Sequence, residues 1–219
     1  MDHLLLPNGL KRLIRDRYLA GVSDAQMKYP LSAGDEDTLT GALGSNISMP
    51  SQMIFSEGQR RFAYQISYHK IRGRGPGAPE KRLGADGIFQ IEVNDERGRR
   101  RKGLPFQAKK GWRNLDHSLF EQANLMIETA GDGIVIDYRK DRYSACRAED
   151  VLHSQADRRV ADRAGNVHPL GQMLANDFLD CTIGKPGLFF DPETEKWQTD
   201  VIHPPAVKHV ITTRVSEIR

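Results

Sequence analysis

Residues 84–110, GADGIFQIEVNDERGRRRKGLPFQAKK, contain two apolar runs separated by a basic turn. The first run starts at Gly84-Ala85-Asp86-Gly87, the second ends at Gln107-Ala108-Lys109-Lys110, and the turn covers residues 95–101. This pattern predicts a β-hairpin that folds near Gly98, with strands over roughly 86–94 and 103–109. The far ends of the two strands then come together, so we expect Asp86 to lie beside Gln107 and Lys109.

The end of this hairpin gathers a set of groups that suits phosphodiester hydrolysis. Side chains alternate across a strand, so Gln107 and Lys109 share one face and Ala108 points away. Magnesium prefers hard oxygen ligands and neutralises charge on a reacting phosphate. We therefore predict that Asp86 is the central ligand of Mg²⁺, with Mn²⁺ as a substitute. Gln107 and the backbone carbonyl of Ala108 add further oxygens, and Lys109 holds the scissile phosphate or the attacking water.

Asp86 followed by Gln107-Ala108-Lys109 on the next strand resembles the PD-(D/E)XK nuclease superfamily, which has the restriction-endonuclease-like fold. Its signature is an Asp at the start of one strand and (Asp/Glu)-X-Lys on the next. Gln107 departs from the commonest form, as in Gln-X-Lys variants that resemble Mrr-type restriction enzymes, and it removes one negative charge from the metal site. The matched core covers roughly residues 34–140. The resemblance implies a DNA endonuclease of bacterial restriction or anti-phage defence, and a homodimer.

The resemblance also implies further polar residues at the site. Glu36, within residues 34–40, is the candidate for the acid that the family carries on the helix before the first core strand, although an acid there also suits a helix start. Glu80 is a rival metal ligand, with an exposed loop acid as the alternative. Gln122, on the helix after Lys109, resembles a glutamine that some members place beside the active site, and a buried hydrogen-bonded amide is the alternative.

Charge alone does not indicate a nucleic-acid partner, because 32 basic and 29 acidic residues leave a net charge of only +3 over 219 residues. The distribution is more informative, since basic side chains cluster near the predicted site, in a Gly/Pro loop and in the hairpin turn. Such clusters neutralise phosphates, although a solvated surface is the alternative for each of them. The predicted nucleic-acid contacts are Lys110, Arg113, Arg72, Arg74, Arg99 and Arg100. DNA is the predicted partner, with RNA as an alternative.

The cysteines and the apolar runs bear on location and cofactors. Cys146 and Cys181 stand alone, without the Cys/His spacing of a structural zinc site, which suits a reducing cytoplasm. No apolar run approaches the ~20 residues of a membrane span. We therefore predict a cytoplasmic protein without a membrane partner.

Periodicity predicts the remaining elements. Helices are expected over 8–20, 35–44, 116–129, 149–153 and 170–181, with a second short helix after Ser23. Strands are expected over 60–72, 134–138, 143–147, 187–190 and 207–215. Together they predict an α/β fold with a central mixed sheet flanked by helices. Residues 1–30 form an N-terminal helical extension, and residues 31–219 form the nuclease-like domain, with a C-terminal elaboration from about 150.

Two other functions stay open at this point. The first is a nucleic-acid-binding module that has the nuclease fold without activity, which the neutral Gln107 favours. The second is a regulatory subunit of a defence complex, in which the basic N-terminal helix and the C-terminal third dock onto a partner protein from the same operon.

Overall fold

The computed structural model describes residues 4–32, 34–71, 85–113, 115–198 and 207–218. Its central strands are β1 (Met53–Glu57), β2 (Arg60–Lys70), β3 (Gly87–Asp95), β4 (Gly98–Lys110), β5 (Ile134–Tyr138), β6 (Tyr143–Arg147), β7 (His168–Pro169), β8 (Lys185–Pro186) and β11 (His209–Ile218). Within the described residues these strands form one sheet in the order β1-β2-β11-β3-β4-β5-β6-β7, with β8 paired to β4. A separate ribbon pairs β9 (Phe190–Asp191) with β10 (Lys196–Trp197).

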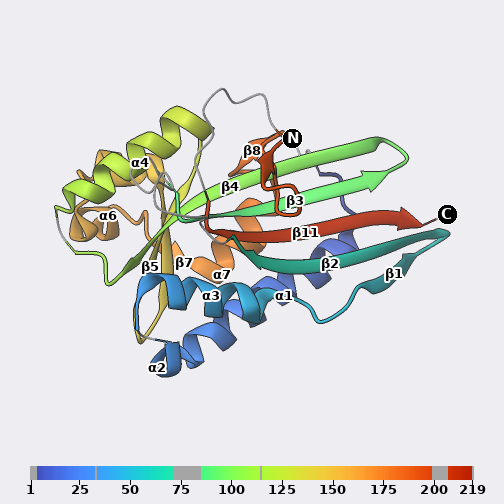
Figure 1. Cartoon of the computed structure of the whole chain (residues 1–219), viewed down its shortest axis with the longest axis horizontal. Coiled ribbons are helices and arrows are strands. Elements are labelled where there is room, and N and C mark those ends of the chain that lie inside the picture. Colours follow the sequence, from blue (N-terminus) through green and yellow to red (C-terminus); the bar gives the residue numbers. More distant parts are fainter. Residues whose placement is uncertain (1–3, 33, 72–84, 114, 199–206, 219) are drawn as a thin grey trace.

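The helices cover both faces of this sheet. They are α1 (Asn8–Met27), α2 (Tyr29–Ser32), α3 (Glu36–Ile47), α4 (His117–Ala130), α5 (Ala148–His153), α6 (Arg158–Arg163), α7 (Leu170–Gln172) and the π-helix η1 (Met173–Phe178). In Figure 1, α1, α2 and α3 lie along the lower side of the view, and α4 and α6 lie at the upper left. The predicted fold class, an α/β fold with a mixed sheet flanked by helices, is confirmed.

Two hydrophobic cores fill the space between helices and sheet. The first joins α1, α3 and η1 to one sheet face, with Ile14, Leu43 and Ala108 among its buried residues. The second joins α4 and α5 to the other face, with Ala123 and Val135 among its buried residues. The predicted N-terminal extension therefore contributes α1 to the same core as α3 and the sheet.

The hairpin of β3 and β4 is confirmed, but its turn is shorter than predicted. The strands are antiparallel and pair Gly87 with Phe106 and Asp95 with Gly98. The basic residues 99–101 thus belong to β4 rather than to a turn. Acids on the neighbouring strand explain this extension, because Arg101 donates to Glu92, its partner in the sheet register, at 2.5 Å.

Long-range pairing gives the sheet its mixed character. β4 runs parallel to β5, and α4 is the crossover between them. The C-terminal strand β11 runs parallel to β3 and antiparallel to β2, which places it between them (Figure 1). The strand over 207–215 was predicted, whereas its position inside the sheet was not.

Several local predictions were wrong in detail. The second short helix expected after Ser23 begins later, at Tyr29 as α2, because α1 continues without a break to Met27. The helix over 170–181 divides into α7 and η1, and the strand over 187–190 shrinks to β9. The edge strand β1 was not predicted, since its side chains are largely exposed and lack an alternating burial pattern.

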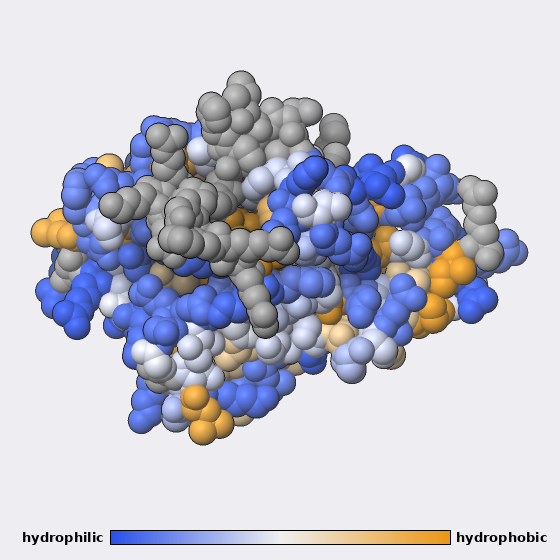
Figure 2. Space-filling view, in the orientation of Figure 1, coloured by the Kyte–Doolittle hydropathy of each residue, from blue (hydrophilic) through white to orange (hydrophobic). Residues whose placement is uncertain are grey.

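The surface agrees with the polar composition. The face seen in Figure 2 is mostly hydrophilic, with small hydrophobic patches. None of the helices in the described ranges combines the length and apolarity needed to cross a bilayer.

Candidate active site

Backbone hydrogen bonds from two neighbouring strands fix Asp86 in place. Its N–H donates to the carbonyl of Phe106 on β4 at 2.8 Å. Its carbonyl accepts from the N–H groups of Lys208 and His209, at the start of β11, at 2.8 and 3.1 Å. Asp86 therefore lies where the ends of three strands meet.

The side chain of Asp86 contacts the predicted partners on β4. Its Oδ2 accepts from the backbone N–H of Ala108 at 2.8 Å and from Nε2 of Gln107 at 2.5 Å. The same Nε2 lies 3.2 Å from the carbonyl oxygen of Ala108. The structure thus brings Asp86, Gln107 and Ala108 together, as the hairpin register requires.

Lys109 follows on the same strand and is oriented by an acid at the start of α4. Its Nζ lies 3.8 Å from Oδ2 of Asp116, and its side chain is 16% exposed. Asp116 also caps α4 by accepting from the N–H of Leu119 at 3.0 Å. Burial raises the pKa of Asp116, but the hydrogen bonds from Leu119 and Ser118 outweigh this effect and lower it. Asp116 therefore carries the negative charge that holds the Lys109 ammonium.

Glu36 approaches the site from the first turn of α3. Its Oε1 accepts from the backbone N–H of Lys110 at 2.9 Å, which ties α3 to the end of β4. The helix is capped by Asp35, whose Oδ1 accepts from the N–H of Thr38 at 2.7 Å. Glu36 is therefore not the N-cap. It lines a pocket of about 280 Å³ that is also lined by Asp35, Asp37, Thr40, Asp86, Lys208 and His209.

Burial and a neighbouring charge raise the pKa of Asp86 above its ordinary value. Desolvation is the largest cause, and the hydrogen bond from the N–H of Ala108 opposes it. The charge of Glu36 raises the pKa further, while Lys208 and Lys109 lower it. The two carboxylates therefore repel each other in a partly desolvated pocket, and a cation between them would relieve that repulsion.

A histidine network borders the same pocket. His209 is buried, its Nε2 lies 3.0 Å from Oδ1 of Asp37, and its Nδ1 lies 2.8 Å from the hydroxyl of Tyr68. Burial lowers the pKa of His209, although Asp37 opposes the shift. Asp37 also pairs with Lys70. Sequence reasoning missed this network because it depends on where β11 enters the sheet.

A second buried carboxylate, Asp137 at the end of β5, was also missed. Its side chain is 1% exposed and accepts from the N–H of Trp112 at 2.7 Å. It also accepts from Nε of Arg139 at 2.8 Å and Nε of Arg158 at 3.2 Å. An acid inside the apolar run 134–138 was the sequence signal for it.

Of the other predicted site residues, Gln122 lies within the described part of the chain, and three lie outside it. Gln122 lies on α4, and its buried Oε1 has no hydrogen-bond donor among the described residues. No hydrogen bond within that part of the chain joins it to Asp86 or Lys109. Glu80, Arg72 and Arg74 lie outside the described residues.

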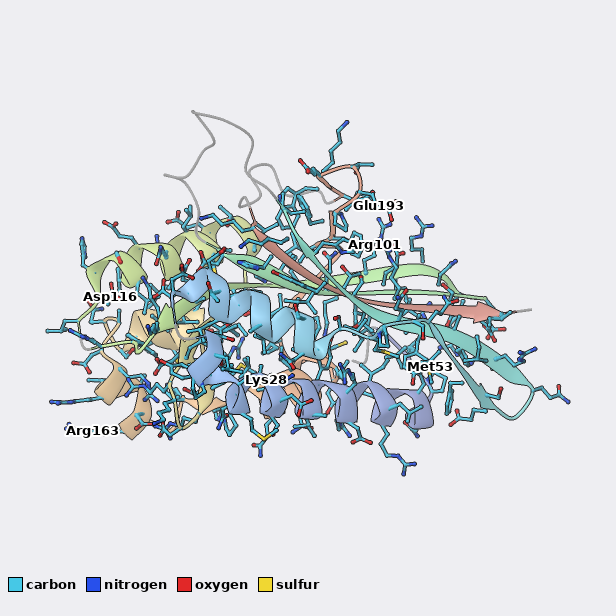
Figure 3. The ribbon with its side chains drawn as sticks, turned by 60° about the horizontal axis from the view of Figure 1, so that its bottom comes forward. Lys28, Met53, Arg101, Asp116, Arg163 and Glu193 are labelled. Carbon is cyan, nitrogen blue, oxygen red and sulfur yellow. The ribbon has the colours of Figure 1, made fainter. Side chains whose placement is uncertain are left out.

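The predicted nucleic-acid contacts fall at opposite ends of β4. The N–H of Lys110 donates to Glu36, which lines the Asp86 pocket, and Arg113 lines a neighbouring pocket together with Lys110. Arg99 and Arg100 lie eleven and ten residues before Lys110 on the same strand, or roughly 35 Å away. Arg100 is held by Asp95 at 2.8 Å and by the carbonyl of Leu4 at 3.1 Å. In Figure 3, Asp116 lies at the left end of the molecule, whereas Arg101, on β4, lies to the right of the centre.

The oxygen ligands available at the site fit a hard cation, provided that carboxylate oxygens and neutral oxygens bind it together. No group of three His, Cys, Asp or Glu side chains in the described ranges could hold a metal ion by itself. Asp86 and Glu36 supply two carboxylates, and the amide of Gln107 and the carbonyl of Ala108 supply neutral oxygens. This all-oxygen set suits Mg²⁺ or Mn²⁺ rather than zinc.

Comparison with known proteins gives no relative: no family model, no curated protein and no solved structure matches the chain.

Proposed function

We propose that this chain is a magnesium-dependent endonuclease that hydrolyses phosphodiester bonds in DNA. The supporting observation is the convergence of Gln107 and the Ala108 N–H on the side chain of Asp86, with Glu36 lining the same pocket. The order of these residues along the chain resembles the PD-(D/E)XK signature. The setting in bacterial restriction or anti-phage defence rests on that resemblance alone.

Each residue has a defined task in this proposal. Bound Mg²⁺ would supply an activated water and neutralise negative charge on the phosphate. Asp86 and Glu36 would hold it with carboxylate oxygens, and Ala108 with its carbonyl. Gln107 would turn its amide so that Oε1 replaces Nε2, because the amide N–H now donates to Asp86. Lys109 would position the phosphate or the water through its ammonium.

Asp116 restricts where the ammonium group of Lys109 can lie. A flexible lysine loses side-chain entropy when it is fixed, and the acid at 3.8 Å offsets part of that cost. Because Asp116 is itself held by the first turn of α4, the ammonium is held by a rigid element. Oriented groups of this kind contribute through proximity rather than through binding strength.

The test is cleavage of a supercoiled plasmid in Mg²⁺ or Mn²⁺ by wild-type protein and by Lys109→Ala. The variant is expected to lose activity by about 100-fold or more, as for removal of a positioned catalytic group. Lys196→Ala, which removes an exposed lysine on β10, is the matched control and should cut like the wild type. Equal cutting by Lys109→Ala would refute the proposal.

One observation favours a second candidate, an inactive nucleic-acid-binding module. The amide of Gln107 donates a hydrogen bond to the carboxylate of Asp86, so this carboxylate has a partner without any metal ion. A metal site that has lost its function would have this arrangement. DNA binding without cleavage under any divalent cation would establish this alternative. Light scattering of the purified chain, with and without DNA, measures whether it forms the homodimer that the resemblance implies. A monomer that does not bind DNA would favour a regulatory subunit that docks onto a partner protein.

A further inference from the structure

Five arginines line a second pocket, of about 420 Å³, beyond the carboxyl ends of β4 and β5. They are Arg113, Arg139, Arg142, Arg158 and Arg159, and we call this site the arginine pocket. We propose that it binds a backbone phosphate of the nucleic-acid strand that is cut at Asp86. This inference rests on the proposed function, and it adds a binding site that the sequence motifs do not contain.

The charge balance of the arginine pocket calls for an anion. Asp137 accepts from Arg139 and Arg158, and Asp162 lies 3.2 Å from Nη1 of Arg158. Two carboxylates therefore face five guanidinium groups. The side chains of Arg113, Arg142 and Arg159 have no acidic partner within the part of the chain that the structure describes. An excess of about three positive charges suits a phosphate group.

Arg158 supplies a donor that is already desolvated. Its side chain is 6% exposed, and its guanidinium lies 5.7 Å from the centre of the Trp112 ring. Its Nη2 is buried and has no hydrogen-bond partner among the described residues. A buried charged donor without a partner is costly, so a ligand oxygen at this position would be strongly favoured. The fixed guanidinium plane matches the geometry of a phosphate.

The one aromatic side chain among the described residues that line this pocket is not available to stack on a base. The ring of Trp112 is 2% exposed, and its Nε1 donates to the carbonyl of Ala156 at 3.0 Å. Trp112 therefore supports Arg158 from below and is not free to contact a base. The arginine pocket is built to recognise the backbone of a strand, without sequence information.

Shared lining residues and one hydrogen bond link the arginine pocket to the Asp86 pocket. Arg113 and Arg139 also line a neighbouring pocket of about 480 Å³, together with Lys110. The N–H of Lys110 donates to Glu36, which lines the Asp86 pocket. Ala108 and Trp112 are four residues apart, or at most about 14 Å. One strand of stacked nucleic acid places a phosphate about every 3.4 Å along its axis, so a few nucleotides would span both sites.

The experiment measures binding of fluorescein-labelled DNA by anisotropy in EDTA, so that cleavage plays no part. The double variant Arg113→Gln/Arg142→Gln removes two exposed cations from the arginine pocket, and Arg12→Gln/Lys196→Gln removes two exposed cations elsewhere. Losing the one phosphate bound in the arginine pocket should reduce the slope of log affinity against log salt by roughly 0.7 for single strands or 0.9 for duplex. The control should keep the wild-type slope.

Further measurements distinguish DNA from free phosphate as the ligand of the arginine pocket. They also separate a failure of this inference from a failure of the proposed function. Competition by inorganic phosphate should weaken DNA binding by the wild type more than by Arg113→Gln/Arg142→Gln. Equal slopes for the two double variants, or stabilisation by inorganic phosphate without any DNA binding, would overturn the inference. If the arginine pocket binds DNA but the wild type never cuts, only the proposed hydrolysis fails. If the wild type cuts and both double variants bind alike, only the arginine pocket fails.

Discussion

Replacing Asp137 with asparagine is expected to destabilise the protein by about 3–5 kcal/mol, the usual cost of breaking a buried ion pair from one side. The carboxylate is 1% exposed, and one of its oxygens accepts from both Arg139 and Arg158. Asparagine keeps the shape and can still accept from the N–H of Trp112. Its amide nitrogen, however, would face two guanidinium donors.

The two arginines do not contribute equally to this cost. The side chain of Arg158 is 6% exposed and that of Arg139 is 38% exposed, so solvent screens the second pair much more. Most of the loss should therefore come from the Arg158 guanidinium, which keeps only the half-exposed carboxylate of Asp162 as an acidic partner. In a double-mutant cycle, Asp137→Asn combined with Arg158→Gln should destabilise less than the sum of the single variants, with a coupling of about 1–3 kcal/mol.

Urea unfolding followed by circular dichroism measures these changes. At a typical m-value of about 2–3 kcal/mol per molar, the midpoint of Asp137→Asn should fall by on the order of 1–2 M. Asp141→Asn makes the same chemical change on an exposed residue and should leave the free energy of unfolding within about 0.5 kcal/mol of the wild type. If Asp137→Asn shifts the midpoint no more than this control, Asp137 does not hold the arginines and the reasoning is wrong.

Three further predictions follow from other groups. Glu36→Gln should weaken Mn²⁺ binding at Asp86 by about 10-fold in calorimetry without changing the fold, and an unchanged affinity would remove Glu36 from the ligand set. Arg100 holds the pKa of Asp95 below its ordinary value, so the carboxylate stabilises the fold above the unfolded pKa of about 3.9 and loses this effect as pH falls through the folded pKa. Asp95→Asn should therefore lose less stability than the wild type between pH 5 and about 3 in urea unfolding, and parallel curves would contradict this. Burial raises the pKa of the Cys146 thiol to about 12, so a variant lacking the other cysteine should react with Ellman's reagent at pH 8 only when unfolded.

Features within one hairpin or one helix start could be predicted from the sequence. The contact of Asp86 with Gln107 and Ala108 follows from a local turn and strand alternation, so a short stretch of chain contains all the information needed. The start of α3 was likewise predicted from its acids: Asp35 is the N-cap, and Glu36 and Asp37 lie in the first turn. The carboxylate of Glu36 accepts a hydrogen bond from the N–H of Lys110 at the end of β4.

Features that depend on distant parts of the chain could not be predicted in this way. Nothing near residue 209 indicates that it would pair beside Gly87, yet this pairing brings His209 to Asp37. The arginine pocket has the same origin, because Arg158 reaches Asp137 across 21 residues from a different element. Arg100 also depends on a distant group, the carbonyl of Leu4. Long-range pairing of this kind is set by the packing of whole layers, and local propensity does not encode it.

A crystal of this protein soaked in Mn²⁺ and measured for anomalous scattering tests the metal site most directly. We predict a peak within about 2.0–2.6 Å of a carboxylate oxygen of Asp86 and of the Ala108 carbonyl, with the Gln107 amide oxygen turned toward it. A fully occupied soak with no peak at Asp86, and with Nε2 of Gln107 still donating to that carboxylate, would contradict the account.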